Sequence, residues 1–224
     1  MKEKIKMVNY KDFRLNKLNT PEYRHLLLLL YYPLYLLIYI FTEKYIVATH
    51  LMHCFIDDII PFCEYFIIPY VFWYIYVIGA IVFSMFYDVE TFKKTMKFII
   101  FTYTLASLII ILYPNYQDMR PVVFERDNIF TKIMGLIYAT DTNTNVFPSV
   151  HVIGSFAALL GFWNLKMFKS IGWKILFIFI TISICASTMF LKQHSFLDFL
   201  GALPICAIGY VLFFWKGRKV KNNN

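Results

Sequence analysis

Two residues near the end of the chain have the types and spacing of a catalytic pair. His194 and Asp198 are four residues apart in the stretch STMFLKQHSFLD, residues 187–198. If a helix begins near His194, both side chains share one helix face, and the carboxylate can accept a hydrogen bond from the imidazole. Such a bond fixes the tautomer of the ring and leaves its other nitrogen free to act as a base or a nucleophile. A pair that only satisfies itself, or a metal site completed by further ligands, is the alternative.

A second histidine follows a predicted helix start. The stretch FPSVHV, residues 147–152, places a proline and Ser149 at the beginning of an apolar run, which is typical of a helix N-terminus. The free N–H groups of such a terminus bind anions, and phosphate is the natural ligand. His151 then lies where it can donate a proton to a leaving oxygen. The alternative is a polar helix cap with an incidental histidine.

An arginine in a third stretch offers a further anion ligand. Arg120 lies in YPNYQDMRP, residues 113–121, and its planar guanidinium matches the geometry of phosphate oxygens. Taken alone, Arg120 is equally well read as an ordinary solvated loop residue. The weight of the prediction comes from the three stretches together, because all of them fall between apolar runs at one membrane surface.

The composition indicates which elements position these residues. The chain has 224 residues, of which 59% are hydrophobic and only 16% are charged, and this is far outside the range of soluble domains. The apolar runs are continuous, whereas the strands of a membrane β-barrel alternate in polarity. We therefore expect an all-α, polytopic membrane protein. Six runs approach the roughly 17–25 residues that a transmembrane helix needs, and they cover residues 25–41, 66–87, 98–113, 147–165, 171–191 and 196–215.

The distribution of lysine and arginine predicts the orientation. With six spans, most of the 22 basic residues fall on the side that holds both termini, which the positive-inside rule assigns to the cytoplasm. The net charge of +8 is then explained by a cytoplasmic rim against anionic lipid, without nucleic acid as a partner. We divide the chain into a basic cytoplasmic segment (1–24), a six-helix membrane domain (25–216) and a basic cytoplasmic tail (217–224). The three polar stretches lie on the extracytoplasmic face of the cell membrane.

The three stretches resemble the signature of the type 2 phosphatidic acid phosphatase superfamily, the lipid phosphate phosphatases. That signature reads K-x6-R-P, P-S-G-H and S-R-x5-H-x3-D over a six-helix membrane core. The resemblance implies a phosphoryl transfer without metal or other cofactor. In it, His194 attacks phosphorus to form a phosphohistidine, Asp198 orients His194, and His151 protonates the departing oxygen. Arg120 and Ser149 hold the phosphate.

The chain departs from this signature at three positions. Tyr113 stands in place of the lysine, Val150 in place of the glycine of P-S-G-H, and Thr188 in place of the second arginine. Two of the three phosphate-binding cations are thus replaced, which should weaken stabilisation of the transition state. Other polar residues of the same loops are candidate phosphate ligands in their place: Lys192, Asn115 and Gln117.

Three functions remain open from the sequence. We favour a phosphatase of lipid phosphates or diphosphates. A lipid head-group phosphotransferase, similar to inositol phosphorylceramide or sphingomyelin synthases, is the first alternative, because that branch keeps both histidines and the aspartate while its clamp diverges. A non-catalytic membrane protein with a vestigial site is the second. The outer stretch FIDDIIPFCEYF, around Asp57 and Asp58, is expected to form a connecting interfacial helix or a lid, and Cys54 and Cys63 beside it are candidates for a disulfide.

Overall fold

The computed structural model describes residues 8–215, and helices dominate it. Five helical segments are long and apolar enough, by length and composition, to cross a membrane. These five segments indicate a multi-pass membrane protein, in agreement with the all-α prediction. They are α1 (Tyr31–Tyr45, preceded by a 3-10 helix over Arg24–Leu30), α3 (Ile67–Tyr87), α4 (Val89–Leu112), α7 (Ile171–Phe190) and α8 (Phe196–Tyr210, continued by a π-helix over Val211–Trp215).

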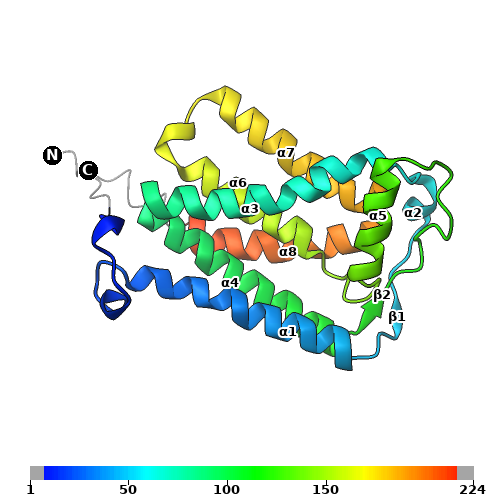
Figure 1. Ribbon diagram of the computed structural model, residues 1–224, viewed down its shortest axis with the longest axis horizontal. Coiled ribbons are helices and arrows are strands. Elements are labelled where there is room, and N and C mark those ends of the chain that lie inside the picture. The colour runs from blue at the N-terminus through cyan, green and yellow to red at the C-terminus, as the bar shows by residue number, and fades with distance from the viewer. Residues whose placement is uncertain (1–7, 216–224) are drawn as a thin grey trace.

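The sixth predicted span corresponds to a shorter helix, α6 (Val150–Asn164), of 15 residues. Helix α6 contacts α3, α4, α7 and α8 and lies among them in Figure 1. Small residues permit this close packing. A Cβ atom added at Gly161, for example, would lie 3.2 Å from Thr95 Oγ1 and 3.4 Å from Ala80 Cβ. Because α6 is below the usual spanning length of roughly 17 residues, the count of six spans stays a prediction.

One helix boundary differs clearly from its prediction. The third span was expected over 98–113, but α4 begins nine residues earlier, at Val89. Asp88 caps this helix, because its Oδ1 accepts hydrogen bonds from the backbone N–H groups of Glu90 (3.1 Å) and Thr91 (3.2 Å). The first turns of α4 carry lysines that end the apolar run without ending the helix. Hydropathy therefore located the apolar part of α4, and the cap sets its start.

The short elements of the fold gather at one end of the helix bundle. Figure 1 shows α2, α5, β1 and β2 together on the right, whereas the described chain begins and ends at the opposite end. Strands β1 (His50–Leu51) and β2 (Asn115–Tyr116) pair in parallel. Helix α5 (Ile129–Thr140), which was not predicted, runs across this end. Its Met134 is fully buried in a small core cluster with Ile67, Tyr70 and Leu191.

Two other expectations concern the outer stretch and the chain ends. The stretch FIDDIIPFCEYF forms the short helix α2 (Phe55–Ile59), followed by a 3-10 helix over Glu64–Phe66. Cys54 and Cys63 are both free thiols, so the structure does not contain the disulfide considered for them. The basic tail expected at 217–224 lies outside the described residues.

Candidate active site

His194 lies in the hairpin between α7 and α8 and is held through one ring nitrogen. Its Nδ1 is 2.9 Å from the carbonyl oxygen of Val146 and 3.1 Å from Asp198 Oδ2. Both partners are acceptors, so Nδ1 carries the proton and the lone pair lies on Nε2. The backbone N–H of His194 also donates to the carbonyl of Thr188, which closes the hairpin. His194 is therefore fixed in the tautomer that a nucleophilic Nε2 requires.

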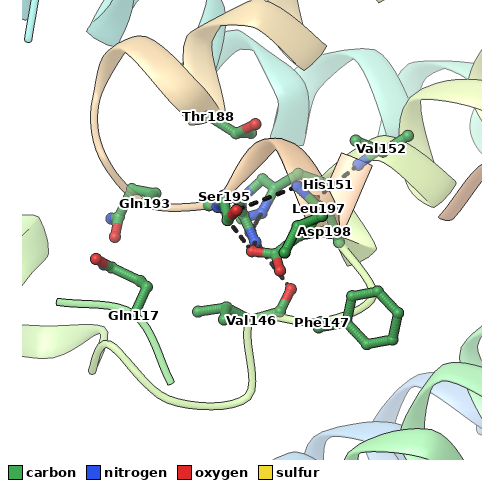
Figure 2. Close-up of polar contacts among 12 residues, drawn as sticks. Gln117, Val146, Phe147, His151, Val152, Thr188, Gln193, Ser195, Leu197 and Asp198 are labelled. Atoms are coloured by element: carbon green, nitrogen blue, oxygen red, sulfur yellow. Dashed lines mark hydrogen bonds and ion pairs between the residues drawn. The ribbon is translucent and has the colours of Figure 1, made fainter. Parts of the chain in front are cut away.

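Asp198 lies in the first turn of α8, four residues after His194, and is completely buried. Its Oδ2 accepts from His194 Nδ1 and, at 2.9 Å, from the backbone N–H of Ser195. The second contact is one half of a capping box at the start of α8. Oδ1 has no hydrogen-bond partner within residues 8–215. Figure 2 shows the carboxylate of Asp198 beside Ser195 and near Val146.

His151 approaches His194 from α6. The two rings meet through His151 Nδ1 and His194 Nε2, which are 3.3 Å apart. Because the lone pair of His194 lies on Nε2, His151 Nδ1 is the donor of this contact. Two aromatic rings of α3 flank His151: Tyr70 stacks at a centroid distance of 4.8 Å, and the Trp73 ring lies at 4.6 Å. Within the described chain, His151 Nε2 has no hydrogen-bond partner.

The contact between the histidines limits what can lie between them. A phosphorus atom poised for attack lies roughly 3–3.5 Å from its nucleophile, and a proton donor lies within about 3 Å of the leaving oxygen. Two nitrogens 3.3 Å apart leave no room for both. A phosphoryl group can be bound between His151 and His194 only when the two rings move apart.

Ser149 connects the two helices that carry the histidines. Its Oγ caps α6 by accepting from the backbone N–H of Val152 at 3.4 Å, and its own N–H donates to the carbonyl of Asp198 at 3.1 Å. Helix α6 begins at Val150, so the proline of FPSVHV precedes the cap and is not the first helical residue. Ser149 is fully buried. In this arrangement it ties α6 to the first turn of α8, and its hydroxyl is already used as a cap.

Arg120 is neither solvated nor a free fork. Its Nη1 donates to the carbonyl of Asp141 at 2.8 Å, and its Nη2 donates to the carbonyl of Thr142 at 2.6 Å and to Gln193 Oε1 at 2.5 Å. The guanidinium also lies over the ring of Tyr138, 4.5 Å from its centroid. Burial lowers the pKa of Arg120, while the nearby Asp141 carboxylate opposes that shift. Only Nε is left without a partner in the described chain.

Lys192 is directed away from the histidines. It adopts a left-handed backbone conformation with φ of 51°, so the hairpin is not helical at this position. Its Nζ donates to the carbonyl of Asp57 at 2.6 Å and to that of Ile60 at 2.5 Å. Burial lowers the pKa of the ammonium group, and the carboxylates of Asp57 and Asp58 oppose the shift. The structure thus places Lys192 on the carbonyls of α2, where it does not reach the predicted phosphate position.

Asn115 and Gln117 are fully buried, and both bind loop backbone. Asn115 accepts from the N–H of Phe147 at 2.8 Å and donates to its carbonyl at 3.0 Å. Gln117 donates to the carbonyl of Lys192 at 2.9 Å and accepts from the N–H of Met119 at 2.7 Å. The two amides hold the loops that precede His151 and His194, and they are not brought to the histidines as phosphate donors.

The positions that depart from the phosphatase signature have other partners. Tyr113 stacks on His50, with ring centroids 3.8 Å apart. Thr188 is buried, and its hydroxyl donates to the carbonyl of Cys185 at 2.8 Å. Within residues 8–215, no group of three or more histidine, cysteine, aspartate or glutamate side chains is placed to hold a metal ion.

Two polar residues next to the site were missed in the sequence. Gln193 is 2% exposed; its Oε1 accepts from Arg120, and its Nε2 has no partner among the residues that the structure describes. Its position directly before His194 was the only available signal. Asp57 is 3% exposed and contacts the start of α8. An aspartate that faces inward from an apolar stretch was its signal, but the sequence did not show which of Asp57 and Asp58 turns inward.

The fold and the site define a helical membrane protein with a buried His–His–Asp arrangement at one end of its bundle. No protein-family model matches the chain, and the searches of curated proteins and of solved structures found no match either.

Proposed function

We propose that this protein is a membrane-embedded, metal-independent phosphatase of lipid phosphates or diphosphates that acts through a phosphohistidine at His194. One observation carries the proposal. His194 Nδ1 is bound by two acceptors, Val146 O and Asp198 Oδ2, while Nε2 lies 3.3 Å from the second histidine. A fixed tautomer, a buried carboxylate behind it and a proton donor in front of it are the parts that nucleophilic catalysis by histidine needs. The resemblance of the three loop stretches to lipid phosphate phosphatases supports the same chemistry.

The proposed reaction has two steps. In the first, the lone pair of His194 Nε2 forms a bond to phosphorus while the bond from phosphorus to the lipid oxygen breaks, and His151 gives its Nδ1 proton to that oxygen. Asp198 stabilises the positive charge that develops on the ring of His194. In the second, His151 takes a proton from water, the water oxygen bonds to phosphorus, and the bond from phosphorus to nitrogen breaks. Free phosphate and the original histidines result.

The same proposal includes an arrangement in the membrane. With α6 counted as a span, the bundle crosses the membrane six times, and both termini lie in the cytoplasm, where the basic residues are concentrated. The histidines then lie at the extracytoplasmic face of the cell membrane, and a lipid head group reaches them from the outer leaflet.

A lipid head-group phosphotransferase is the second candidate, and the cations of the site favour it. Arg120 has one N–H without a partner in the described chain, and Lys192 is directed to α2. A phosphomonoester carries a charge of about −1.5 to −2 at pH 7, whereas the phosphodiester of a lipid head group carries one negative charge. A site with so little positive charge suits the diester better. In that case a lipid alcohol, instead of water, takes the phosphoryl group from His194.

The test is product formation by purified protein in detergent and EDTA, with lipid monophosphates, lipid diphosphates and phosphodiester lipids, the last also with a lipid alcohol. Wild type is compared with His194→Ala and with His53→Ala, a surface histidine paired with Asp58. Free phosphate that needs His194 and not His53 supports the phosphatase. A new phosphorylated lipid with the same dependence supports the transferase. Activity that requires Mg²⁺, or that survives in His194→Ala, contradicts both, and the complete absence of turnover supports a non-catalytic protein.

A further inference from the structure

The short outer helix α2 makes an unexpected contact with the start of α8. Asp57, in the middle of α2, directs its carboxylate onto this helix N-terminus: Oδ1 accepts from the backbone N–H of Phe196 at 2.7 Å, and Oδ2 accepts from Ser195 Oγ at 2.5 Å. Oδ2 also accepts from the N–H of Cys54 at 2.9 Å, which closes α2 on itself. An acidic group at a helix N-terminus is favoured both by the free N–H groups and by the helix dipole.

A second contact joins the same two segments in the opposite direction. Lys192, two residues before His194, donates from Nζ to the carbonyls of Asp57 and Ile60 at the end of α2. The hairpin therefore gives a cation to the carbonyl end of α2, and α2 gives a carboxylate to the N-terminus of α8. We call residues 54–60, with these two contacts, the α2 strap.

Ser195 connects the α2 strap to the catalytic pair. Its hydroxyl donates to Asp57, and its backbone N–H donates to Asp198 Oδ2 at 2.9 Å. The oxygen of Asp198 that receives this bond is the one bound to His194 Nδ1. Asp57 thus fixes the residue that fixes Asp198. Because reacting groups misplaced by about 1 Å can cost roughly 100-fold in rate, the position of Ser195 matters for the chemistry of His194.

We propose that Asp57 is a positioning residue, and that the α2 strap holds the hairpin of His194 and the first turn of α8 in their catalytic arrangement. This inference rests on the proposed function for its rate measurements, but the strap itself can be tested without turnover. Asp57 does not contact either histidine; it acts through Ser195 and Asp198.

The chain offers a matched control in the next residue. Asp58 has a side chain that is 66% exposed and pairs with His53 on the surface at 2.8 Å. Asp57→Asn keeps the size of the side chain, but it replaces one acceptor oxygen by a donor that faces other donors. Asp58→Asn makes the same chemical change four or more bonds from any contact with α8. Asp57→Glu restores the charge with one more methylene.

The rate experiment compares these three variants with wild type on the substrate found for the protein, and each rate is normalised to folded protein by size-exclusion chromatography. We expect Asp57→Asn to lower kcat roughly 10- to 100-fold with KM changed by less than about twofold. Asp58→Asn should match wild type, and Asp57→Glu should recover part of kcat. A purely structural role would lower yield and melting temperature but not kcat per folded molecule. A folded Asp57→Asn protein with kcat within about twofold of wild type overturns the proposal.

Hydrogen–deuterium exchange gives the answer without turnover. Peptides that cover residues 192–199 should exchange faster in Asp57→Asn than in wild type, and Asp58→Asn should not differ from wild type. Equal exchange in all three proteins overturns the strap, whatever the activity. If the wild type shows no turnover but Asp57→Asn shows faster exchange at 192–199, the proposed function fails while the strap stands.

Discussion

The two histidines and the polar residues of the surrounding loops differ in what their side chains bind. His151 and His194 meet each other through ring nitrogens, and each keeps a nitrogen lone pair that backbone does not occupy. Arg120, Lys192, Asn115 and Gln117 are bound to backbone carbonyls and N–H groups of the same loops. The first set is arranged for a reaction, and the second set maintains the shape of the loops. Residues that look alike in sequence as phosphate ligands therefore have different functions in the structure.

The largest effect on the reacting set is expected for Asp198→Asn. The carboxylate bound to His194 Nδ1 is replaced by a neutral amide, which no longer stabilises a charged ring and can present a donor to Nδ1. By analogy with other histidine–carboxylate pairs, kcat should fall by roughly 100-fold or more. Initial rates of phosphate or phospholipid formation measure it. Asp127→Asn is the control, because Asp127 is 82% exposed and pairs only with Lys132 in the described chain. A rate within about threefold of wild type would mean that Asp198 is only a helix cap.

Arg120→Lys tests the boundary between the two sets. A lysine cannot reach the acceptors that the guanidinium bridges, which lie in residues 138–142 and at Gln193. We expect the free energy of unfolding to fall by about 2 kcal/mol and the activity to fall by roughly tenfold, read from melting in detergent and from initial rates. The control is Arg126→Lys, at an arginine that is 56% exposed and pairs with Glu64. Loss of activity with an unchanged melting curve would instead make Arg120 a phosphate ligand.

Asn115→Ala should act on stability more than on the reaction. Asn115 makes two hydrogen bonds to Phe147 and one to the carbonyl of Tyr113, all in a buried position. Loss of these bonds leaves buried backbone groups unpaired, at a cost of about 1–3 kcal/mol, while kcat of the remaining folded protein changes little. Melting curves and rates per folded molecule separate the two effects, with Asn164→Ala, at an exposed helix position, as the control. A lower kcat without a lower melting temperature would return Asn115 to the reacting set.

This division explains how much could be predicted from the sequence. The apolar helices and the pairing of His194 with Asp198 depend on short-range spacing, and they follow from hydropathy and from the four-residue repeat of a helix. The partners of Lys192 and Arg120 are carbonyls of residues far away in the chain, such as Asp57 and Asp141. Every residue has a carbonyl group, so composition cannot indicate which one a cation binds. The inward turn of Asp57 has the same origin, since it depends on where the N-terminus of α8 lies.

The smallest effect is expected for Tyr113→Lys, which restores the cation of the phosphatase signature. Tyr113 is 41% exposed, and its ring stacks on His50 instead of facing His151 or His194. A lysine there would extend into solvent, where its charge is screened, so we expect the rate on a lipid monophosphate to change by less than about twofold. Tyr113→Gln, a neutral side chain of similar reach, is the control for loss of stacking. A larger rise in rate with lysine than with glutamine would show that residue 113 reaches the phosphate, and that the loop set joins the histidines when substrate binds.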